Sequence, residues 1–186
     1  MTAPVLSRDC EQLTIDDWFT RPDVPEWSEL YQGVLIVAPP PDMRHQIALS
    51  RLHNTLFVFA EHAEGIALVA PTGVVLAADI GFEPDVLYLS PERVHLLQQR
   101  GIEGPPDIVV EVASPGTRRF DRLTKLPTYL EYGVREVWIV DPESRTVEVH
   151  EPGLAEPRTA RFGEPIPSRI VDVGSASLER VPESFA

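Results

Sequence analysis

Two carboxylates, Asp85 and Glu111, are the side chains of this sequence best placed to do chemistry. Glu111 lies within the apolar run Asp107–Ala113 (DIVVEVA), which predicts a strand buried on both faces. Asp85 has a similar setting, between Pro84 and the apolar stretch Val86–Leu89. A buried carboxylate is costly unless a cation compensates it. On neighbouring strands the two carboxylates can share one hard cation such as Mg²⁺, which activates water and neutralises charge on a phosphodiester.

Each carboxylate can also be explained without a role in catalysis or metal binding. Asp85 can lie in water at the end of its strand, and the sequence does not separate this reading from the functional one. Glu111 can pair with an arginine, although its apolar flanks favour a functional role.

A mixed sheet flanked by helices, of the α/β or α+β type, must position these side chains. Asp42 is the expected N-cap of a long amphipathic helix that ends near His62. Pro71-Thr72-Gly73 predicts a hairpin between two short apolar strands. The expected helices are a short one near Thr14–Phe19, the long one, a short one opened by Ser90, and Phe120–Tyr132; the expected strands are Gly33–Ala38, Ile66–Ala70, Val74–Ala77, Pro84–Leu89, Asp107–Ala113, Glu136–Val140, Thr146–His150 and one near Arg169–Val173.

The length of 186 residues and the hydrophobic content of 43 % fit one domain with a sizeable core. Residues 1–28 are expected to form an N-terminal arm with the short helix. Residues 29–152 are expected to form the core, and residues 153–186 a loop-rich extension that packs on the same domain.

Composition also restricts the setting of the protein. No apolar run approaches the roughly 20 residues that a membrane span needs, and the N-terminus lacks the pattern of a secretory signal. The single cysteine, Cys10, cannot form an internal disulfide or a cysteine-rich zinc site. We therefore expect a cytoplasmic protein that does not associate with membranes.

The net charge of −13 argues against simple electrostatic binding of nucleic acid, because non-specific affinity comes mostly from Lys and Arg on phosphates. An acidic protein can still bind DNA if its positive charge is local. The densest basic cluster is formed by Arg118, Arg119, Arg122 and Lys125.

Several motifs resemble those of the PD-(D/E)-x-K nucleases. PDV at Pro84–Val86 and EVAS at Glu111–Ser114 carry this resemblance. The wider pattern is similar to one branch, the Uma-two restriction endonucleases, over about residues 14–150. The segments that match are ELYQGVLIVAPPPDMRH at Glu29–His45, EPDV at Glu83–Val86, PPDIVVEVASPGT at Pro105–Thr117 and DRLTKLPTYLEYGVREVWIVDP at Asp121–Pro142.

The resemblance implies a restriction endonuclease-like fold with Mg²⁺ or Mn²⁺ as cofactor, and it implies roles for individual residues. Asp85 and Glu111 would bind the metal together with the backbone carbonyl of Val112. Glu29 would be the acidic residue of the first motif, near the same site. The superfamily pattern places a lysine two residues after the glutamate, where this chain has Ala113. In this branch a lysine on the following helix is thought to replace it, and Lys125 fits that place.

Lys125 also has a simple structural reading. Asp121 and Lys125 lie four residues apart on one predicted helix, so they can form a surface ion pair worth about 0.3–0.5 kcal/mol. Pro127 should kink this helix or mark its first turn, which bears on where Lys125 points. Both readings stay open at the level of sequence, and Tyr129, one turn further, can be core or substrate contact.

Candidate substrate contacts are His45, Ser114 and the three arginines of the basic cluster. A lone histidine after a proline turn is more often a capping or surface residue, and only the resemblance raises His45 to a candidate. Ser114 follows the Glu111 strand and can bind a carboxylate or a phosphate, although such a serine more often ends a strand.

Two functions of different classes remain. The first is a Mg²⁺- or Mn²⁺-dependent endonuclease that hydrolyses DNA, which the resemblance implies to be a homodimer. The second is a catalytically inactive nuclease fold that serves as a binding module, which the net charge and the missing lysine favour. The sequence does not separate DNA from RNA or single strands as the substrate.

Overall fold

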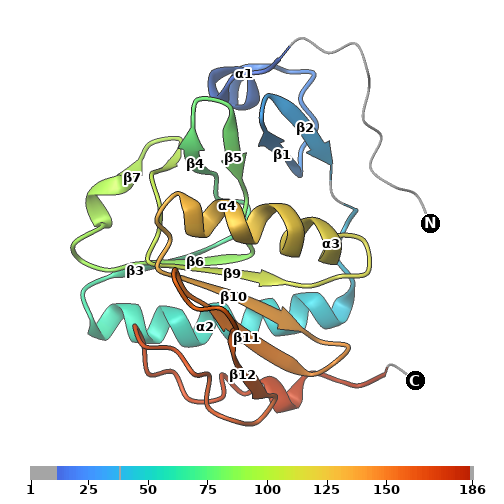
Figure 1. Cartoon of the computed structure of the whole chain (residues 1–186), viewed down its shortest axis with the longest axis vertical. Coiled ribbons are helices and arrows are strands. Elements are labelled where there is room, and N and C mark those ends of the chain that lie inside the picture. Colours follow the sequence, from blue (N-terminus) through green and yellow to red (C-terminus); the bar gives the residue numbers. More distant parts are fainter. Residues whose placement is uncertain (1–11, 38, 185–186) are drawn as a thin grey trace.

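The computed structural model describes residues 12–37 and 39–184, so residues 1–11 of the expected N-terminal arm, with Cys10, and Ala38 lie outside the described residues. Short strands dominate the chain, and helices separate them (Figure 1). The elements in chain order are α1 (Ile15–Thr20), β1 (Ser28–Tyr31), β2 (Val34–Val37), α2 (Met43–His62), β3 (Ile66–Val69), β4 (Val74–Ala77), β5 (Ile80–Phe82), β6 (Val86–Leu89), η1 (Val94–Leu96), β7 (Leu97–Gln98), β8 (Gly101–Glu103), β9 (Ile108–Val112), α3 (Arg118–Phe120), η2 (Asp121–Lys125), α4 (Leu126–Glu131), β10 (Glu136–Asp141), β11 (Thr146–His150), β12 (Arg158–Arg161) and η3 (Leu178–Arg180).

The strands form two mixed sheets. The first has the order β2-β1-β5-β4-β8-β7, and the second has the order β12-β11-β10-β9-β6-β3. In the second sheet β9 and β10 are parallel, whereas β6 runs antiparallel to β9. The fold is therefore a mixed α/β structure with helices against its sheets, as the sequence predicts.

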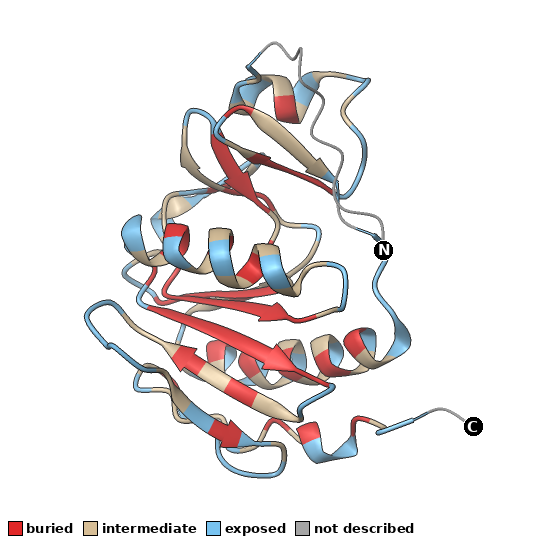
Figure 2. Ribbon diagram, turned by 45° about the vertical axis from the view of Figure 1, so that its right-hand side comes forward, coloured by how far each residue is buried: buried red, intermediate tan, exposed pale blue. Residues whose placement is uncertain are grey.

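Strands β6, β9 and β10 form the centre of the second sheet, and all of their residues are buried (Figure 2). One face, with Ile108 and Val110, packs in a cluster with Leu52 of α2. The other face, with Val109, packs in a cluster with Tyr129 of α4. A strand covered on both faces needs apolar residues at every position, which explains the uninterrupted run around Glu111.

Helix α2 begins where the sequence predicts, because the Asp42 side chain accepts a hydrogen bond from the His45 N–H. Its buried residues, among them Leu52 and Leu56, recur at helical spacing on the face toward the second sheet. This long helix lies across the sheet opposite α4 (Figure 1), and His45 lies in its first turn.

The predicted hairpin around Pro71-Thr72-Gly73 is wrong. Strand β3 pairs with β6 in the second sheet, whereas β4 pairs with β5 and β8 in the first. The backbone on the two sides of the connection finds different partners: the Ala70 N–H donates to the Asp85 carbonyl, and the Gly73 carbonyl accepts from the Ile102 N–H. The segment is thus a crossover between sheets, and the hairpin partner of β4 is β5.

The C-terminal extension also differs from the sequence prediction. Residues 169–173 form no strand, and the strand of this region is β12, which pairs with β11. Ile166, Val171 and Leu178 pack into the same cluster as α2. Apolar burial fixes the extension on the core without a strand at 169–173.

The helix expected at Ser90 is replaced by turns and the short 3₁₀ helix η1. The Ser90 hydroxyl has no hydrogen-bond partner among the described residues, so it does not act as a cap. Helix α1 begins with a capping box, in which the Thr14 hydroxyl accepts from the Asp17 N–H and the Asp17 carboxylate accepts from the Thr14 N–H.

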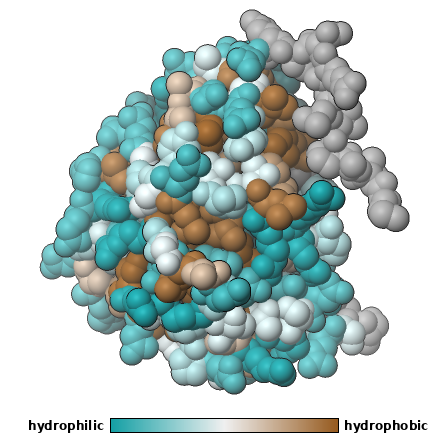
Figure 3. Space-filling model, viewed as in Figure 1, coloured by the Kyte–Doolittle hydropathy of each residue, from teal (hydrophilic) through white to brown (hydrophobic). Residues whose placement is uncertain are grey.

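None of the helices within the described ranges combines the length and the apolar character required to cross a bilayer. Hydrophilic side chains cover most of the face in Figure 3, and apolar side chains gather near its centre.

Candidate functional site

Asp85 and Glu111 lie opposite each other at one end of the β6–β9 pair. Val86 pairs with Val110, and continuing this antiparallel register by one residue sets Asp85 opposite Glu111. Directly opposed side chains point to the same face, with Cβ atoms about 4.5–5.5 Å apart. Both residues line one pocket of about 1110 Å³. The structure therefore brings together the two carboxylates that the sequence singles out.

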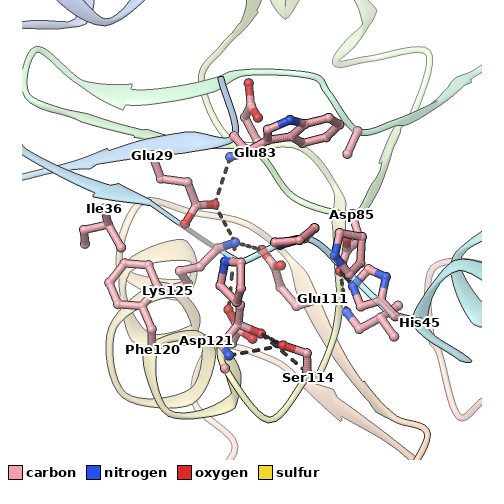
Figure 4. A pocket seen from close by; sticks show the side chains of 18 of the residues that line it. Glu29, Ile36, His45, Glu83, Asp85, Glu111, Ser114, Phe120, Asp121 and Lys125 are labelled. Atoms are coloured by element: carbon pink, nitrogen blue, oxygen red, sulfur yellow. Dashed lines mark hydrogen bonds and ion pairs between the residues drawn. The ribbon is translucent and has the colours of Figure 1, made fainter. Parts of the chain in front are cut away.

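The pocket is strongly acidic. Among the described residues that line it, Lys125 is the single permanently charged cation, and His45 is the other basic side chain. Figure 4 shows the acidic side chains arriving from several elements and Lys125 between two of them. The carboxylates that line the pocket belong to Glu29, Glu83, Asp85, Glu111 and Asp121.

Lys125 contacts both of the predicted acidic motifs at once. Its Nζ lies 2.7 Å from Glu29 Oε1 and 2.6 Å from Glu111 Oε1, and its side chain is 4 % exposed. The pair with Asp121 exists, at 4.0 Å, but it is buried, so the expectation of a surface pair is wrong. The amine thus reaches the site that the family resemblance implies for it.

The charge of Lys125 is held by its neighbours. Burial by itself lowers the pKa of Lys125, but the carboxylates of Glu111 and Glu29 outweigh it, and the pKa is raised well above its usual value. Lys125 is therefore an ammonium at neutral pH and acts as a fixed positive charge.

A π-helical turn aims Lys125 into the pocket. Helix α3, the π-helical η2 and α4 follow one another without a break, and the Leu126 N–H donates to the Asp121 carbonyl five residues earlier. Pro127 follows immediately and has no N–H to continue a regular ladder. Single π turns within α-helices occur frequently at functional sites. Here the turn buries Asp121 and Lys125 together, which the expected kink did not specify.

Glu111 is held by the helix that carries Lys125. The Tyr129 hydroxyl donates to Glu111 Oε1 over 2.8 Å, the same oxygen that contacts the ammonium. Burial raises the pKa of Glu111 well above its usual value, and Lys125 opposes this shift only in part. Among the described residues no hydrogen bond reaches Oε2, so the second oxygen remains available to a ligand.

Glu29 joins the two sheets at the pocket. It lies on β1 of the first sheet, and its Oε1 accepts from the Glu83 N–H at 3.1 Å as well as from Lys125. Burial raises the pKa of the Glu83 carboxyl, and the nearby charge of Glu29 raises it further. Glu29 therefore anchors the ammonium from the side opposite to Glu111.

Asp85 is fixed by a backbone group and by a histidine. Its Oδ2 accepts from the Val112 N–H at 2.7 Å and lies 3.1 Å from His45 Nε2. Burial lowers the pKa of His45, but the hydrogen bond and charge of Asp85 outweigh it, so the pKa is raised. The Nδ1 atom of His45 is buried and has no partner within the described ranges. His45 thus orients Asp85, while the role implied for the Val112 carbonyl stays a prediction.

Asp121 adds a further acid behind Lys125. Burial raises its pKa to about 6, and the charge of Lys125 opposes the shift. Near neutral pH this carboxyl is mostly ionised and contributes to holding the ammonium.

Most of the predicted substrate arginines are engaged elsewhere. Arg118 bridges Asp141 and Glu143, and Arg122 forms two hydrogen bonds with Glu148. Neither lines the pocket, and Arg119, which is exposed, does not line it either. The charges of Arg118 and Arg122 are thus paired with acidic side chains of the protein itself. Substrate contact by Arg119 remains a prediction.

Ser114 lines the pocket but is used locally. Its hydroxyl lies 3.0 Å from the Thr117 hydroxyl and accepts from the Thr117 N–H. These contacts close the turn that leads into α3. Its proposed contact with substrate therefore rests on position alone.

Three residues of the site were not recognised as such from the sequence. Tyr129 remained undecided between core and substrate contact, Asp121 appeared only as a surface partner of Lys125, and Glu83 was not singled out. The motif D-x-x-x-K-x-x-x-Y contains Asp121, Lys125 and Tyr129. Its spacing of four residues puts the polar groups of these three side chains on one helical face. The apolar environment that makes them informative depends on the other strands.

Comparison with known proteins identifies the family of this chain and a solved structure with a similar fold. The model of the Uma2 family, described as "Putative restriction endonuclease", matches residues 15–178. A crystal structure of a putative nuclease belonging to DUF820 from Anabaena variabilis ATCC 29413 is similar with a TM-score of 0.74, at 20 % identity over 89 % of this chain and 97 % of that one. No curated protein matches the sequence. Because the family model covers nearly the whole described chain, the protein belongs to the Uma2 family.

Proposed function

We propose that this protein hydrolyses phosphodiester bonds in DNA with Mg²⁺ or Mn²⁺ bound at Asp85 and Glu111. The observation that carries the proposal is the opposed pair of carboxylates in one pocket, with the Lys125 ammonium 2.6 Å from Glu111. Family membership supports nuclease chemistry, and the fold it shares with the cyanobacterial protein is compatible with it.

The donor set of the pocket fits a hard divalent cation. No cage of three or more His, Cys, Asp or Glu side chains is present in the described part of the chain. Mg²⁺ does not require such a cage, because it is commonly held by one or two carboxylates together with water and phosphate oxygens. Asp85 and Glu111 provide the two carboxylates, and the excess of acid in the pocket is the charge that a divalent cation would balance.

When bound, the cation supplies Lewis-acid stabilisation of the phosphate and lowers the pKa of water. Asp85 and Glu111, with the Val112 carbonyl, would hold it. Lys125 places a positive charge beside the phosphate oxygens, where charge develops as the bond breaks. Glu29 keeps this amine ionised and in place. Water is added across one P–O bond, which yields a phosphate monoester and a free hydroxyl.

A second candidate is a binding module without activity. It is favoured by the contacts of Lys125, whose ammonium bridges Glu29 and Glu111. A buried acid compensated in this way can persist for stability alone. In that case cations would leave the protein unaffected. The homodimer that the family resemblance implies belongs to the first candidate.

Incubation of supercoiled plasmid with Mg²⁺ or Mn²⁺ tests the proposal. We expect nicking by the wild type and none by Glu111→Gln or Asp85→Asn. Glu61→Gln is the matched control. Glu61 is exposed on α2, so this substitution makes the same chemical change away from the pocket. Equal nicking by wild type and Glu111→Gln would reveal a contaminant and contradict the assignment.

Thermal melting separates the two candidates independently of turnover. A cation that binds the folded state raises the melting temperature as its concentration increases. We expect such a rise for the wild type and for Glu61→Gln, and its loss in Glu111→Gln. A melting temperature that stays the same when Mg²⁺ or Mn²⁺ is added would support the binding module.

A further inference from the structure

Trp27 is exposed at the pocket in a way that folding does not explain. Its side chain lines the pocket, yet the residue is 59 % exposed. The other two tryptophans, Trp18 and Trp138, are buried, and each indole N–H donates to a protein acceptor. A large aromatic ring left in solvent contributes little to the core, and exposed aromatic surface commonly marks a contact site.

The backbone of Trp27 adds a second, independent observation. Its φ is +63°, in the left-handed region that a bulky residue seldom adopts. Strained conformations of this kind concentrate at ligand-binding sites. The chain therefore holds a tryptophan in an unfavourable conformation, largely outside the core, two residues before Glu29.

Apolar side chains continue the surface of Trp27 into the pocket. Ser28, the next residue, pairs with Val37, which is 51 % exposed and also lines the pocket. Ile36, Pro39 and Phe120 extend this wall toward the acidic side chains. The pocket thus combines apolar side chains, among them an exposed aromatic ring, with the carboxylates and Lys125.

The charges around the pocket do not suit an intact duplex. Proteins that bind duplex DNA derive most of their affinity from several Lys and Arg side chains on phosphates. In the described part of the chain, Lys125 is the single permanent cation of the lining, and Arg118 and Arg122 are held by acidic side chains. Proteins that bind unpaired nucleic acid add stacking of bases on aromatic rings to their contacts with phosphates, and this wall offers such a ring.

The depth of the reactive groups leads to the same conclusion. The side chains of Glu111 and Lys125 are 5 % and 4 % exposed. A phosphate can reach them only if its nucleotide enters the pocket. A stiff duplex resists the bending that brings one of its nucleotides into a pocket, whereas an unpaired nucleotide of a flexible strand enters directly.

We propose that the substrate is an unpaired nucleotide of single-stranded DNA, with its base stacked on Trp27 and its phosphodiester at Glu111 and Lys125. This inference rests on the proposed function, since it names the substrate class of the same site. It predicts that single strands are cleaved faster than the same sequence in a duplex. It also predicts that Trp27 contributes to binding rather than to the chemical step.

Steady-state cleavage of a labelled oligonucleotide of about 12 nucleotides, alone and annealed to its complement, tests this inference. With Mg²⁺ or Mn²⁺ we expect kcat/KM at least about tenfold higher for the single strand. Trp27→Ala should raise KM about tenfold with little change in kcat, and Trp27→Phe, which keeps a flat ring, should stay near the wild type. Phe57→Ala is the matched control, since Phe57 is an exposed aromatic residue, at 45 %, that does not line the pocket.

The possible outcomes separate the inference from the proposed function. Equal or faster cleavage of the duplex, or a Trp27→Ala enzyme with unchanged KM, would overturn the inference and leave the nuclease intact. If neither substrate is cleaved, fluorescence anisotropy of the labelled strands decides. Tighter binding of the single strand that Trp27→Ala abolishes supports the inference even then, and absence of that preference overturns it.

Discussion

Glu111 and Glu136 are both buried glutamates, on the adjacent parallel strands β9 and β10, yet they serve different ends. Glu136 accepts from the Trp138 indole, the Ser168 hydroxyl and the Arg169 N–H, and it lies near Arg158, so both of its oxygens are used. It does not line the pocket.

Glu111 has a different set of contacts. Its bonds converge on Oε1, and it opens onto the acidic pocket. The comparison teaches that burial alone does not identify a functional carboxylate. What distinguishes Glu111 is an oxygen left for a ligand.

The largest expected effect is on Lys125. Lys125→Met should lower the free energy of unfolding by about 3–5 kcal/mol near neutral pH without metal, because Glu29 and Glu111 lose their buried counter-charge. Urea titration measures this change. Added Mg²⁺ or Mn²⁺ should recover part of the loss. A stability close to the wild type would show that the carboxylates of the pocket are protonated or hydrated instead.

Asp121 makes stability depend on pH. Its carboxyl has a pKa of about 6 in the folded protein, against the ordinary value of 3.8 in the unfolded chain. The folded state therefore binds a proton more tightly. Stability from this group is therefore present below about pH 4 and is lost as pH rises through 6, by up to about 3 kcal/mol. Urea titrations across this range should show a flatter profile for Asp121→Asn than for the wild type. Parallel profiles would contradict the shift.

Glu136→Gln tests the glutamate whose two carboxylate oxygens are both hydrogen-bonded within the protein. Loss of charge-assisted hydrogen bonds should lower the free energy of unfolding by about 2 kcal/mol. The rise in melting temperature with Mg²⁺ or Mn²⁺ should remain as in the wild type. Loss of that rise would mean that the two glutamates are not functionally separate.

Glu111→Gln should have the opposite effects to Glu136→Gln on stability and on the response to cations. Because burial raises the pKa of Glu111, a neutral side chain should leave stability within about 1 kcal/mol of the wild type, or raise it, while the response to cations is lost. Chemical denaturation with and without Mg²⁺ measures both effects. A strongly destabilised variant would place Glu111 beside Glu136 as a structural residue.

A small effect on cation binding is expected for Tyr129, which donates to Glu111. Tyr129→Phe keeps the ring packed against Phe82 and should cost about 1 kcal/mol of stability. If the hydroxyl orients Glu111 for the cation, the concentration of Mg²⁺ needed for half of the thermal shift should rise several-fold. An unchanged cation requirement would limit Tyr129 to packing.

The sequence alone determined the elements whose signals are local. The apolar run around Glu111 specified β9, and the Asp42 cap specified the start of α2. The motifs around Asp85 and Glu111 indicated the pair of carboxylates before their register was known. These signals can be read because apolar spacing and caps act over a few residues.

The tertiary structure decided what depends on distant partners. It separated β3 from β4, because their backbones pair with β6 and β5 instead of each other. It turned Arg118 and Arg122 away from the pocket through ion pairs with residues more than 20 positions away. It also aimed Lys125 at Glu29, 96 residues earlier in the chain. Such contacts depend on which segments meet in space, and that depends on the packing of the whole chain rather than on local pattern.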